Sequence, residues 1–350
     1  MLPLRWGEDD GLDELTGYLR GLPDWLELIV VDGSPGELFE RHSRAWSSLG
    51  CHLPPDPALE TPMGKVSGVL TGVRQAGHEA VVIADDDVRY EERSLIRAIV
   101  LLGLADCVRP QNYFDPLPWH ARWDTGRILL NRSLGADFPG TLAVRRSALL
   151  RAGGYDGDVI FENLELIRTI RAAGGQVISP LDLYVARRPP TTRHFLSQRI
   201  RQAYDDFAIP PRMAAWLAVL PALALALARG RRREAALAAA GLIALAELGR
   251  RRAGGRPYFP ASASALAPMW VLERGVCAWL ALRVRVTRGG IPYGDAVVPR
   301  AATSMRRLRR RFAVAGGERQ RDGLAPRSAE ANQLVGPVAE RLAPGSPAAA

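Results

Sequence analysis

The sequence is poor in cysteine: it has three in 350 residues, Cys51, Cys107 and Cys277. None belongs to a C-x-x-C pair, and an odd number cannot complete a disulfide framework. These spacings disfavour a structural zinc site and a small disulfide-stapled fold, and they fit a reducing compartment. With 47% hydrophobic residues, the chain can instead form one or two domains with real hydrophobic cores.

Glycine-rich phosphate loops are also missing. Neither a Walker loop nor a G-x-G-x-x-G pattern occurs, so a bound diphosphate would have to be held by a metal ion and by lysine or arginine. The opening residues, MLPLRWGEDDGLDELTG, lack the apolar core of a signal peptide, and we expect none there.

Positive charge is present in excess and is unevenly placed. The formal net charge is +9, and arginines cluster at residues 229–233, 249–256 and 306–311. Such clusters suit nucleic acid or an anionic lipid surface. Because they flank apolar helices and lack interleaved aromatic residues, we expect a membrane partner and no nucleic acid.

Up to about residue 190, short apolar stretches alternate with stretches of helical periodicity. We predict strands at 26–31, 80–84, 106–110, 140–144 and 176–179, and helices at 64–77, 92–103, 121–134 and 162–175. This alternation predicts an α/β layer with a mostly parallel sheet. Ligands of such folds gather at the carboxyl ends of the strands, where Asp32 and Asp85 to Asp87 lie.

The composition changes after residue 208. Residues 213–228 and 235–248 are almost entirely apolar, and a third stretch, 265–284, is interrupted by Glu273 and Arg274. One reading is a buried helical subdomain; we favour membrane-associated helices over 209–290, with a thin or re-entrant hairpin. Both flanks are basic, so charge does not choose the orientation. For 291–350 we predict a basic, disordered tail.

Three successive aspartates follow the predicted strand at 80–84, in the segment VVIADDDVRY. A helix N-cap would explain one of them. Asp85 and Asp87 share a side of an extended chain, so both can reach one hard cation such as Mg²⁺ or Mn²⁺. The sequence therefore predicts a metal site here.

Six segments now occur in a suggestive order: VVDGS, GK at the start of a helix, VVIADDD, GTLAVRRSALLRAGGYD, ENLEL with RAAGG, and QRIRQ. Together they cover about residues 26–207, and in this order they resemble the family 2 glycosyltransferases. The resemblance implies a nucleotide-diphospho-sugar transferase (GT-A type) fold for a catalytic domain at 1–208. It also implies inverting, metal-dependent transfer of a sugar from a nucleotide diphosphate.

The resemblance also assigns roles to residues. Asp32 would contact the nucleotide base, Lys65 would lie near the nucleotide, and Asp85 and Asp86 would face the nucleotide-sugar. Asp85 and Asp87 would hold the Mg²⁺ or Mn²⁺ ion, which offsets the charge that builds on the departing diphosphate.

The sequence departs from the family pattern at the expected catalytic base. The family usually has Glu-Asp where this chain has Glu162-Asn163, and an amide cannot accept the proton. We predict that Glu162 replaces it, with Glu165 next and Asp158 as an outside candidate. Both glutamates have an alternative role as structural residues of a helix.

A second departure concerns the acceptor side. QRIRQ (198–202) resembles the Q-x-x-R-W motif of membrane polysaccharide synthases, which implies acceptor-side roles for Gln198 and Arg201. Gln202 replaces the tryptophan, which speaks against long-chain processivity. Trp119 and Trp123 are either acceptor-binding or packing residues, and His194 is either a third metal ligand or structural.

These observations predict a membrane-associated inverting glycosyltransferase whose catalytic domain faces the cytoplasm and whose acceptor is a lipid-linked or membrane-proximal glycan. A nucleotidyltransferase and a catalytically degenerate membrane scaffold are the alternatives. Family members open with a longer apolar strand than MLPLRW provides. We therefore expect the true start to lie upstream, or the protein to be poorly stable.

Overall fold

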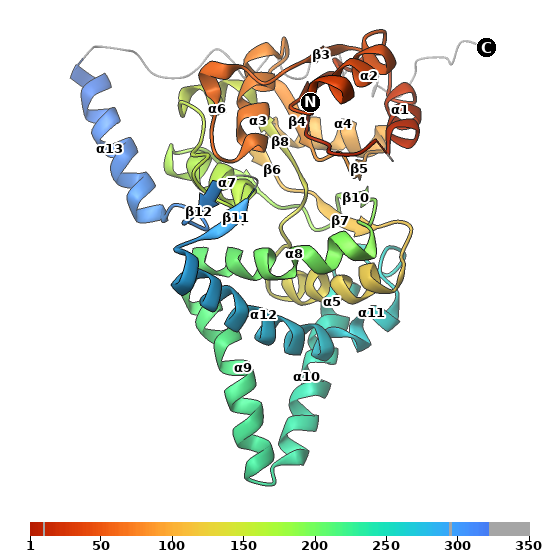
Figure 1. Cartoon of the computed structure of the whole chain (residues 1–350), viewed down its shortest axis with the longest axis vertical. Coiled ribbons are helices and arrows are strands. Elements are labelled where there is room, and N and C mark those ends of the chain that lie inside the picture. The colour runs from red at the N-terminus through yellow and green to blue at the C-terminus, as the bar shows by residue number, and fades with distance from the viewer. Residues whose placement is uncertain (10, 294–295, 322–350) are drawn as a thin grey trace.

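The computed structural model describes residues 1–9, 11–293 and 296–321. An α/β layer lies at one end of the molecule, a layer of helices lies beneath it, and a helical hairpin projects from the opposite side (Figure 1).

The first three strands are parallel and adjacent in space. They are β1 (Leu2–Leu4), β2 (Ile29–Asp32) and β3 (Cys51–Leu53), in the order β1-β2-β3. Leu4 pairs with Asp32, so the β1 and β2 ends meet. The ammonium group of Met1 donates to Val82 O at 2.7 Å, and Ala84 N donates to Met1 O at 3.1 Å. These bonds join β1 to β4 (Ala80–Ala84), so β1 takes a central position although it is only three residues long. The expectation that the true start of the chain lies upstream of Met1 stays a prediction.

The sheet is less parallel than predicted. It continues from β4 through β8 (Thr141–Arg145), β6 (Cys107–Val108) and β9 (Val177–Ile178). β8 runs antiparallel to both of its neighbours, whereas β6 and β9 are parallel. The reason lies in α5 (Trp119–Leu134), which precedes β8 and packs on the lower helices instead of crossing over the sheet. The chain therefore enters β8 from the opposite end.

The remaining elements of this layer cover the sheet or extend it. A small sheet of order β5-β10-β7 lies beside it, formed by β5 (Val88–Arg89), β10 (Tyr184–Arg187) and β7 (Gln111–Phe114). The helices are α1 (Leu12–Arg20), α2 (Gly36–Trp46), α3 (Gly64–Gln75), α4 (Glu92–Leu101), α6 (Arg146–Arg151) and α7 (Glu162–Ala172). A short 3₁₀ turn, Pro57–Leu59, precedes α3. Val31, Val69 and Val144 are buried in the main core between these helices and the sheet.

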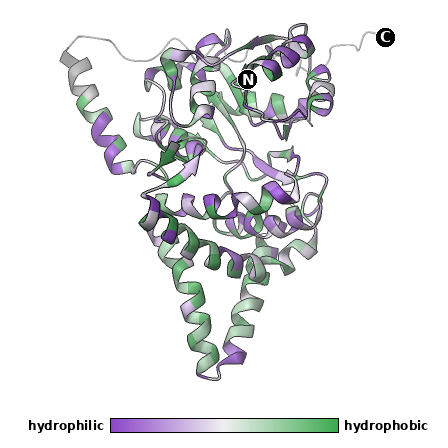
Figure 2. Cartoon of the chain, viewed as in Figure 1, coloured by the Kyte–Doolittle hydropathy of each residue, from purple (hydrophilic) through white to green (hydrophobic). Residues whose placement is uncertain are grey.

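The lower layer consists of α5, α8 (Thr192–Tyr204), α11 (Ala261–Ala265) and α12 (Ala267–Arg288). A 3₁₀ turn, Asp205–Ala208, leads from α8 to α9 (Pro210–Ala228), and α9 and α10 (Arg232–Arg251) form the projecting hairpin. Another 3₁₀ turn, Arg252–Gly254, follows. The hairpin is mostly apolar up to its arginine-rich tip (Figure 2). Within the described ranges, α9 alone is long and apolar enough to cross a membrane, and 6% of its apolar window is buried.

The third apolar stretch, now part of α12, turns the two charged residues near its middle inward. Glu273 bonds with Arg199, and Arg274 is 2% exposed beside Asp206. Met269 and Val276 of the same helix are exposed. Glu273 and Arg274 therefore leave the outward side of α12 apolar.

The start of the predicted tail is folded. β11 (Ile291–Tyr293) pairs with β12 (Ala296–Val298), and α13 (Met305–Arg321) follows. The prediction of disorder is thus wrong for this part, because backbone bonds such as Phe161 N to Ala301 O (2.9 Å) fix it to the α/β layer. Such long-range bonds leave no periodic signal in the sequence. The remainder of the predicted tail, 322–350, lies outside the described residues.

Candidate active site

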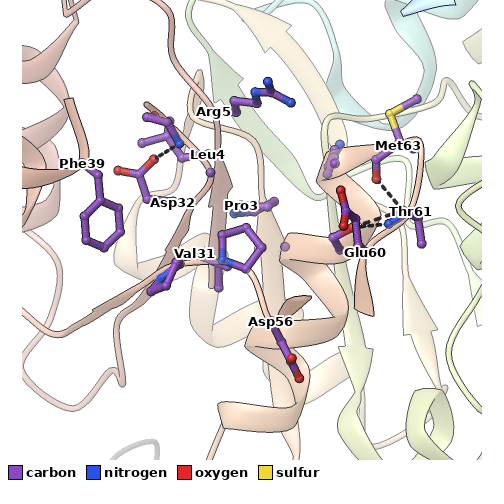
Figure 3. Close-up of a pocket in the computed structure, with 18 of the residues that line it drawn as sticks. Pro3, Leu4, Arg5, Val31, Asp32, Phe39, Asp56, Glu60, Thr61 and Met63 are labelled. Carbon is purple, nitrogen blue, oxygen red and sulfur yellow. Dashed lines mark hydrogen bonds between the residues drawn. The ribbon is translucent and has the colours of Figure 1, made fainter. Parts of the chain in front are cut away.

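A cavity of about 1110 Å³ opens where the carboxyl ends of β1, β2 and β4 meet the starts of α3 and α7. Asp32 and Phe39 lie on one side of it, and Thr61 and Met63 lie on the other (Figure 3). Its charged lining residues come from six segments of the chain: Arg5, Asp32, Glu40, Asp56, Glu60, Lys65, Asp85, Asp86, Glu162 and Arg201. The cavity therefore collects most of the site residues that the sequence predicted.

Asp32 ends β2 and is held at the cavity wall by three donors. Ser34 N donates to Oδ1 (2.8 Å), and Oδ2 contacts His42 Nδ1 (2.6 Å) and His52 Nε2 (3.1 Å). Burial opposes ionisation of Asp32, but these hydrogen bonds outweigh it and lower the pKa to about 2. Phe39 stacks on His52 with ring centroids 4.5 Å apart and also lines the cavity. The Asp32 carboxylate is thus fixed and fully buried behind the cavity wall, and Phe39 presents an aromatic surface, which suits a planar base.

Lys65, at the start of α3, is the only lysine in the chain. Its Nζ lies 2.5 Å from Asp85 Oδ1 and 2.7 Å from Glu162 Oε1. Burial alone would lower the pKa of Lys65, but the two carboxylates raise it well above its ordinary value. One ammonium group thus links the aspartates after β4 to the first residue of α7.

The three successive aspartates have different surroundings. Asp85 and Asp86 line the cavity, and Trp6 Nε1 donates to Asp86 Oδ2 at 2.5 Å. Asp87 is not among the lining residues that the structure describes; Arg187 Nε donates to its Oδ2 at 2.7 Å. Burial, reinforced by the other two aspartates, raises the pKa of Asp87 to about 6, although Arg187 opposes the shift.

The donor set fits a hard divalent cation. Asp87 Oδ1 is buried without a hydrogen-bond partner among the described residues, so one carboxylate oxygen is left for a ligand. In the described ranges, no three His, Cys, Asp or Glu side chains are grouped to hold a metal ion. Two carboxylates suffice for Mg²⁺ when phosphate oxygens and water complete its shell.

The structure separates the three candidates for the catalytic base. Glu162 lines the cavity; burial would raise its pKa, but the nearby Lys65 ammonium outweighs this and lowers it. Glu165 is fully buried, and its Oε2 accepts from Thr303 N at 2.6 Å. Asp158 is half exposed, 3.4 Å from Arg300. Of the three, Glu162 alone is in the cavity lining.

Asn163 does not face the cavity. Its Nδ2 donates to Pro139 O at 3.1 Å, so the side chain serves as a structural donor. An aspartate in its place would put a carboxylate against that carbonyl oxygen.

Of the predicted acceptor-side residues, Arg201 alone belongs to the described cavity lining. Arg201 lines the cavity, whereas Gln198 keeps a buried Oε1 without a partner among the described residues. Trp119 is 57% exposed and packs edge-on against His120 and Phe195. Trp123 packs on the core of the lower layer. His194 is exposed and belongs to the first turn of α8, where its backbone N–H is capped by Thr191.

The sequence patterns did not predict two residues of the cavity lining, Arg5 and Tyr293. Arg5 follows β1, is exposed, and has no ion pair or hydrogen bond in the part of the chain that the structure describes. Tyr293 comes from β11, and the guanidinium of Arg201 lies 5.6 Å from its ring centroid. The signal for Arg5 was its place directly after an apolar strand; Tyr293 gave none, because only the tertiary fold brings β11 to the site.

Comparison with solved structures identifies the fold of this chain, whereas the sequence comparisons find no match. No protein-family model matches the chain, and no curated protein is significantly similar to it in sequence. Among solved structures, a mannosyltransferase from Pyrobaculum calidifontis in complex with GDP-Man and Mn²⁺ is 23% identical. The match covers 79% of this chain and 85% of that one, with a TM-score of 0.50.

More distant matches include TarS from S. aureus in complex with UDP-GlcNAc (13% identical, 56% and 59% covered, TM-score 0.40). Another is glucosyl-3-phosphoglycerate synthase from Mycobacterium tuberculosis (18% identical, 55% and 72% covered, TM-score 0.36). The extensive match to the mannosyltransferase shows that this chain has the α/β fold of the GT-A type of nucleotide-sugar glycosyltransferase.

Proposed function

We propose that this protein is a metal-dependent, inverting glycosyltransferase that moves a sugar from a nucleoside-diphosphate donor to a membrane-proximal or lipid-linked glycan. One observation carries the proposal: a single cavity joins the Asp32 end, the aspartates after β4, and Glu162. This order matches what a transfer reaction requires, with a base-binding end, a diphosphate-binding centre and a proton acceptor beyond it.

The donor would lie along the cavity with its base at Asp32 and Phe39. Asp85 and Asp87 would hold Mg²⁺ or Mn²⁺, which supplies charge stabilisation for the departing diphosphate. That the similar mannosyltransferase was solved with GDP-Man and Mn²⁺ supports this assignment. Arg5, which has no partner in the described part of the chain, adds a cation for the phosphate oxygens.

The acceptor hydroxyl would lose its proton to Glu162. Lys65 contacts both Glu162 and Asp85, so a diphosphate that draws the ammonium toward itself weakens the Lys65–Glu162 ion pair. A carboxylate released from an ion pair is a stronger base. Donor binding would thus prepare Glu162 to accept the proton.

The α9–α10 hairpin and the outward face of α12 support a membrane role. At about 1.5 Å per residue, the 19 residues of α9 span about 28 Å, close to the ~30 Å hydrocarbon core of a bilayer. Leu225 and Leu237 are half or more exposed along the hairpin. We place the hairpin in the membrane, with the catalytic domain on the cytoplasmic side.

Calorimetry with GDP and UDP tests the metal site. Binding should require Mn²⁺ or Mg²⁺, and Asp87→Asn should weaken it only when metal is present. Equal affinity with and without metal would contradict the proposed role of the aspartates.

A donor-hydrolysis assay with the same protein tests catalysis. Binding of a nucleotide-sugar without any turnover would favour a degenerate scaffold, for which the loss of the usual aspartate at Asn163 is the specific argument.

A further inference from the structure

The end of the cavity nearest to Glu162 is completed by a segment from the far end of the chain. Tyr293, the last residue of β11, lines the cavity together with Glu162 and Arg201. More than 90 residues separate Arg201 and Tyr293 in sequence, yet the guanidinium and the ring are 5.6 Å apart. The Tyr293 ring is therefore an aromatic surface beside Arg201 in the cavity lining.

The segment that carries Tyr293 is firmly attached to the catalytic domain. Ile160 N donates to Arg300 O (3.0 Å), and Phe161 N donates to Ala301 O (2.9 Å). Glu165 Oε2 accepts a hydrogen bond from Thr303 N (2.6 Å), and the hydroxyl group of Tyr204 donates a hydrogen bond to Pro299 O (2.8 Å). These bonds hold residues 299–303 against the turn that precedes Glu162. Tyr293 and Glu162 are thus fixed to a common framework.

Gln202, which stands where the Q-x-x-R-W motif has a tryptophan, cannot supply this aromatic surface. Gln202 Oε1 accepts from Arg199 at 2.9 Å, so the side chain is directed into a buried ion-pair network instead of the cavity. Trp119 and Trp123 are outside the described cavity lining as well. Among the described lining residues, the aromatic side chains are Phe39, at the Asp32 end, and Tyr293.

We infer that Tyr293 binds the acceptor by stacking on a sugar ring, and so takes the place of the missing tryptophan; this rests on the proposed function. A saccharide presents an apolar C–H face and polar edges. The phenol ring offers the apolar surface, and the Arg201 guanidinium beside it offers N–H donors for hydroxyl groups. The acceptor is accordingly a pyranoside whose ring packs on Tyr293 while its reacting hydroxyl faces Glu162.

Ligand-observed NMR on the full-length protein tests this inference. The protein is loaded with Mg²⁺ and GDP or UDP, and the methyl glycosides of mannose, glucose, galactose and N-acetylglucosamine serve as probes. Saturation transfer should detect at least one glycoside with wild type. Tyr293→Ala should weaken that binding roughly tenfold, whereas Tyr293→Phe, which keeps the ring, should stay within about twofold. Trp25→Ala, an aromatic change outside the described cavity lining, is the matched control.

The outcomes separate the two proposals. If nucleotide binds but no glycoside does, or if Tyr293→Ala binds the glycoside as wild type does, the inference is wrong and the proposed function stands. Equal losses in Tyr293→Ala and Tyr293→Phe, or a loss of nucleotide affinity in both, would also contradict stacking. If neither GDP nor UDP binds wild type, the proposed function itself fails, and the inference fails with it.

Discussion

Asp32 should make the stability of the folded protein depend on pH in the acid range. Its folded pKa of about 2 lies below the ordinary 3.8, so its ionised form stabilises the fold above pH 4. This contribution is lost as the pH falls from about 4 toward 2. The side chain is fully buried, and the shift corresponds to about 2 kcal/mol.

Asp32→Asn should therefore unfold more easily than wild type at pH 6, and the difference should shrink between pH 4 and pH 2. Chemical denaturation at a series of pH values measures it. A difference that is constant across this range would show that the Asp32 carboxylate is not held ionised by its neighbours.

Glu162 is the residue on which the proposed chemistry depends. Glu162→Gln keeps the shape of the side chain but removes the proton acceptor, so turnover should fall by about 10²–10⁴-fold. Donor affinity should change little, because the donor side keeps Asp85 and Asp87. Steady-state transfer kinetics, with calorimetry of the donor, check both expectations.

Two carboxylates serve as matched controls for Glu162. Glu165→Gln and Asp158→Asn should keep turnover near the wild-type rate, since Glu165 bonds to Thr303 and Asp158 is at the surface. Loss of turnover in either one, with Glu162→Gln active, would move the base to that position. If all three variants remain active, base catalysis by this group of residues is ruled out.

At the scale of elements, a buried ion-pair network connects three helices of the lower layer. Arg199 of α8 donates to Asp124 of α5 (2.8 Å) and to Glu273 of α12 (3.0 Å). Asp124 is also paired with Arg127 (3.0 Å). Burial would raise the pKa of Asp124, but the two arginines outweigh it and hold the pKa well below the ordinary value. The network aligns α8, which carries Arg201, with the helices beneath it.

Arg199→Leu should destabilise the protein by about 3–5 kcal/mol, because Glu273 loses its arginine partner and the buried Asp124 keeps only Arg127. Arg193→Leu removes an exposed arginine from the same helix and should have little effect. Thermal or chemical unfolding in detergent compares the two. Similar stability of both variants would mean that the network does not hold the helices together.

At the scale of the whole molecule, the α9–α10 hairpin differs from the α/β layer in hydropathy. The ribbon of the α/β layer has many hydrophilic positions, whereas the hairpin is mostly hydrophobic along its length (Figure 2), and Leu225 and Leu237 are exposed on it. Replacing Leu225 and Leu237 together by aspartate should release the protein from lipid vesicles, since each charge is costly in hydrocarbon. Flotation with phosphatidylcholine–phosphatidylglycerol vesicles measures the bound fraction.

Leu104→Asp is the control for this change, because Leu104 is 71% exposed on the catalytic domain. It should float as wild type does. A wild-type protein that is monodisperse without detergent and does not float would instead favour the interpretation of 209–290 as a helical subdomain in water.

Local patterns in the sequence predicted the strands at 80–84 and 140–144, the helices at 64–77 and 121–134, and the placement of Asp32, Lys65, Asp85 and Glu162 at the ends of elements. They could do so because apolar periodicity specifies elements, and because parallel neighbouring strands bring their carboxyl ends to one edge. The two long apolar runs likewise predicted the helices of the hairpin.

Long-range contacts determined the features of the fold and the site that the sequence did not predict. β8 is reversed because α5 packs beneath the sheet, and Glu165 is an anchor because a distant N–H, that of Thr303, reaches it. Tyr293 enters the site only because residues 299–303 bond to the turn before Glu162. Such contacts join segments 90 or more residues apart, and a single sequence carries no periodic signal for a pairing at that distance. Strongly periodic elements were therefore predictable one by one, whereas short strands such as β11, and the partners of each element across the chain, were decided by the tertiary structure.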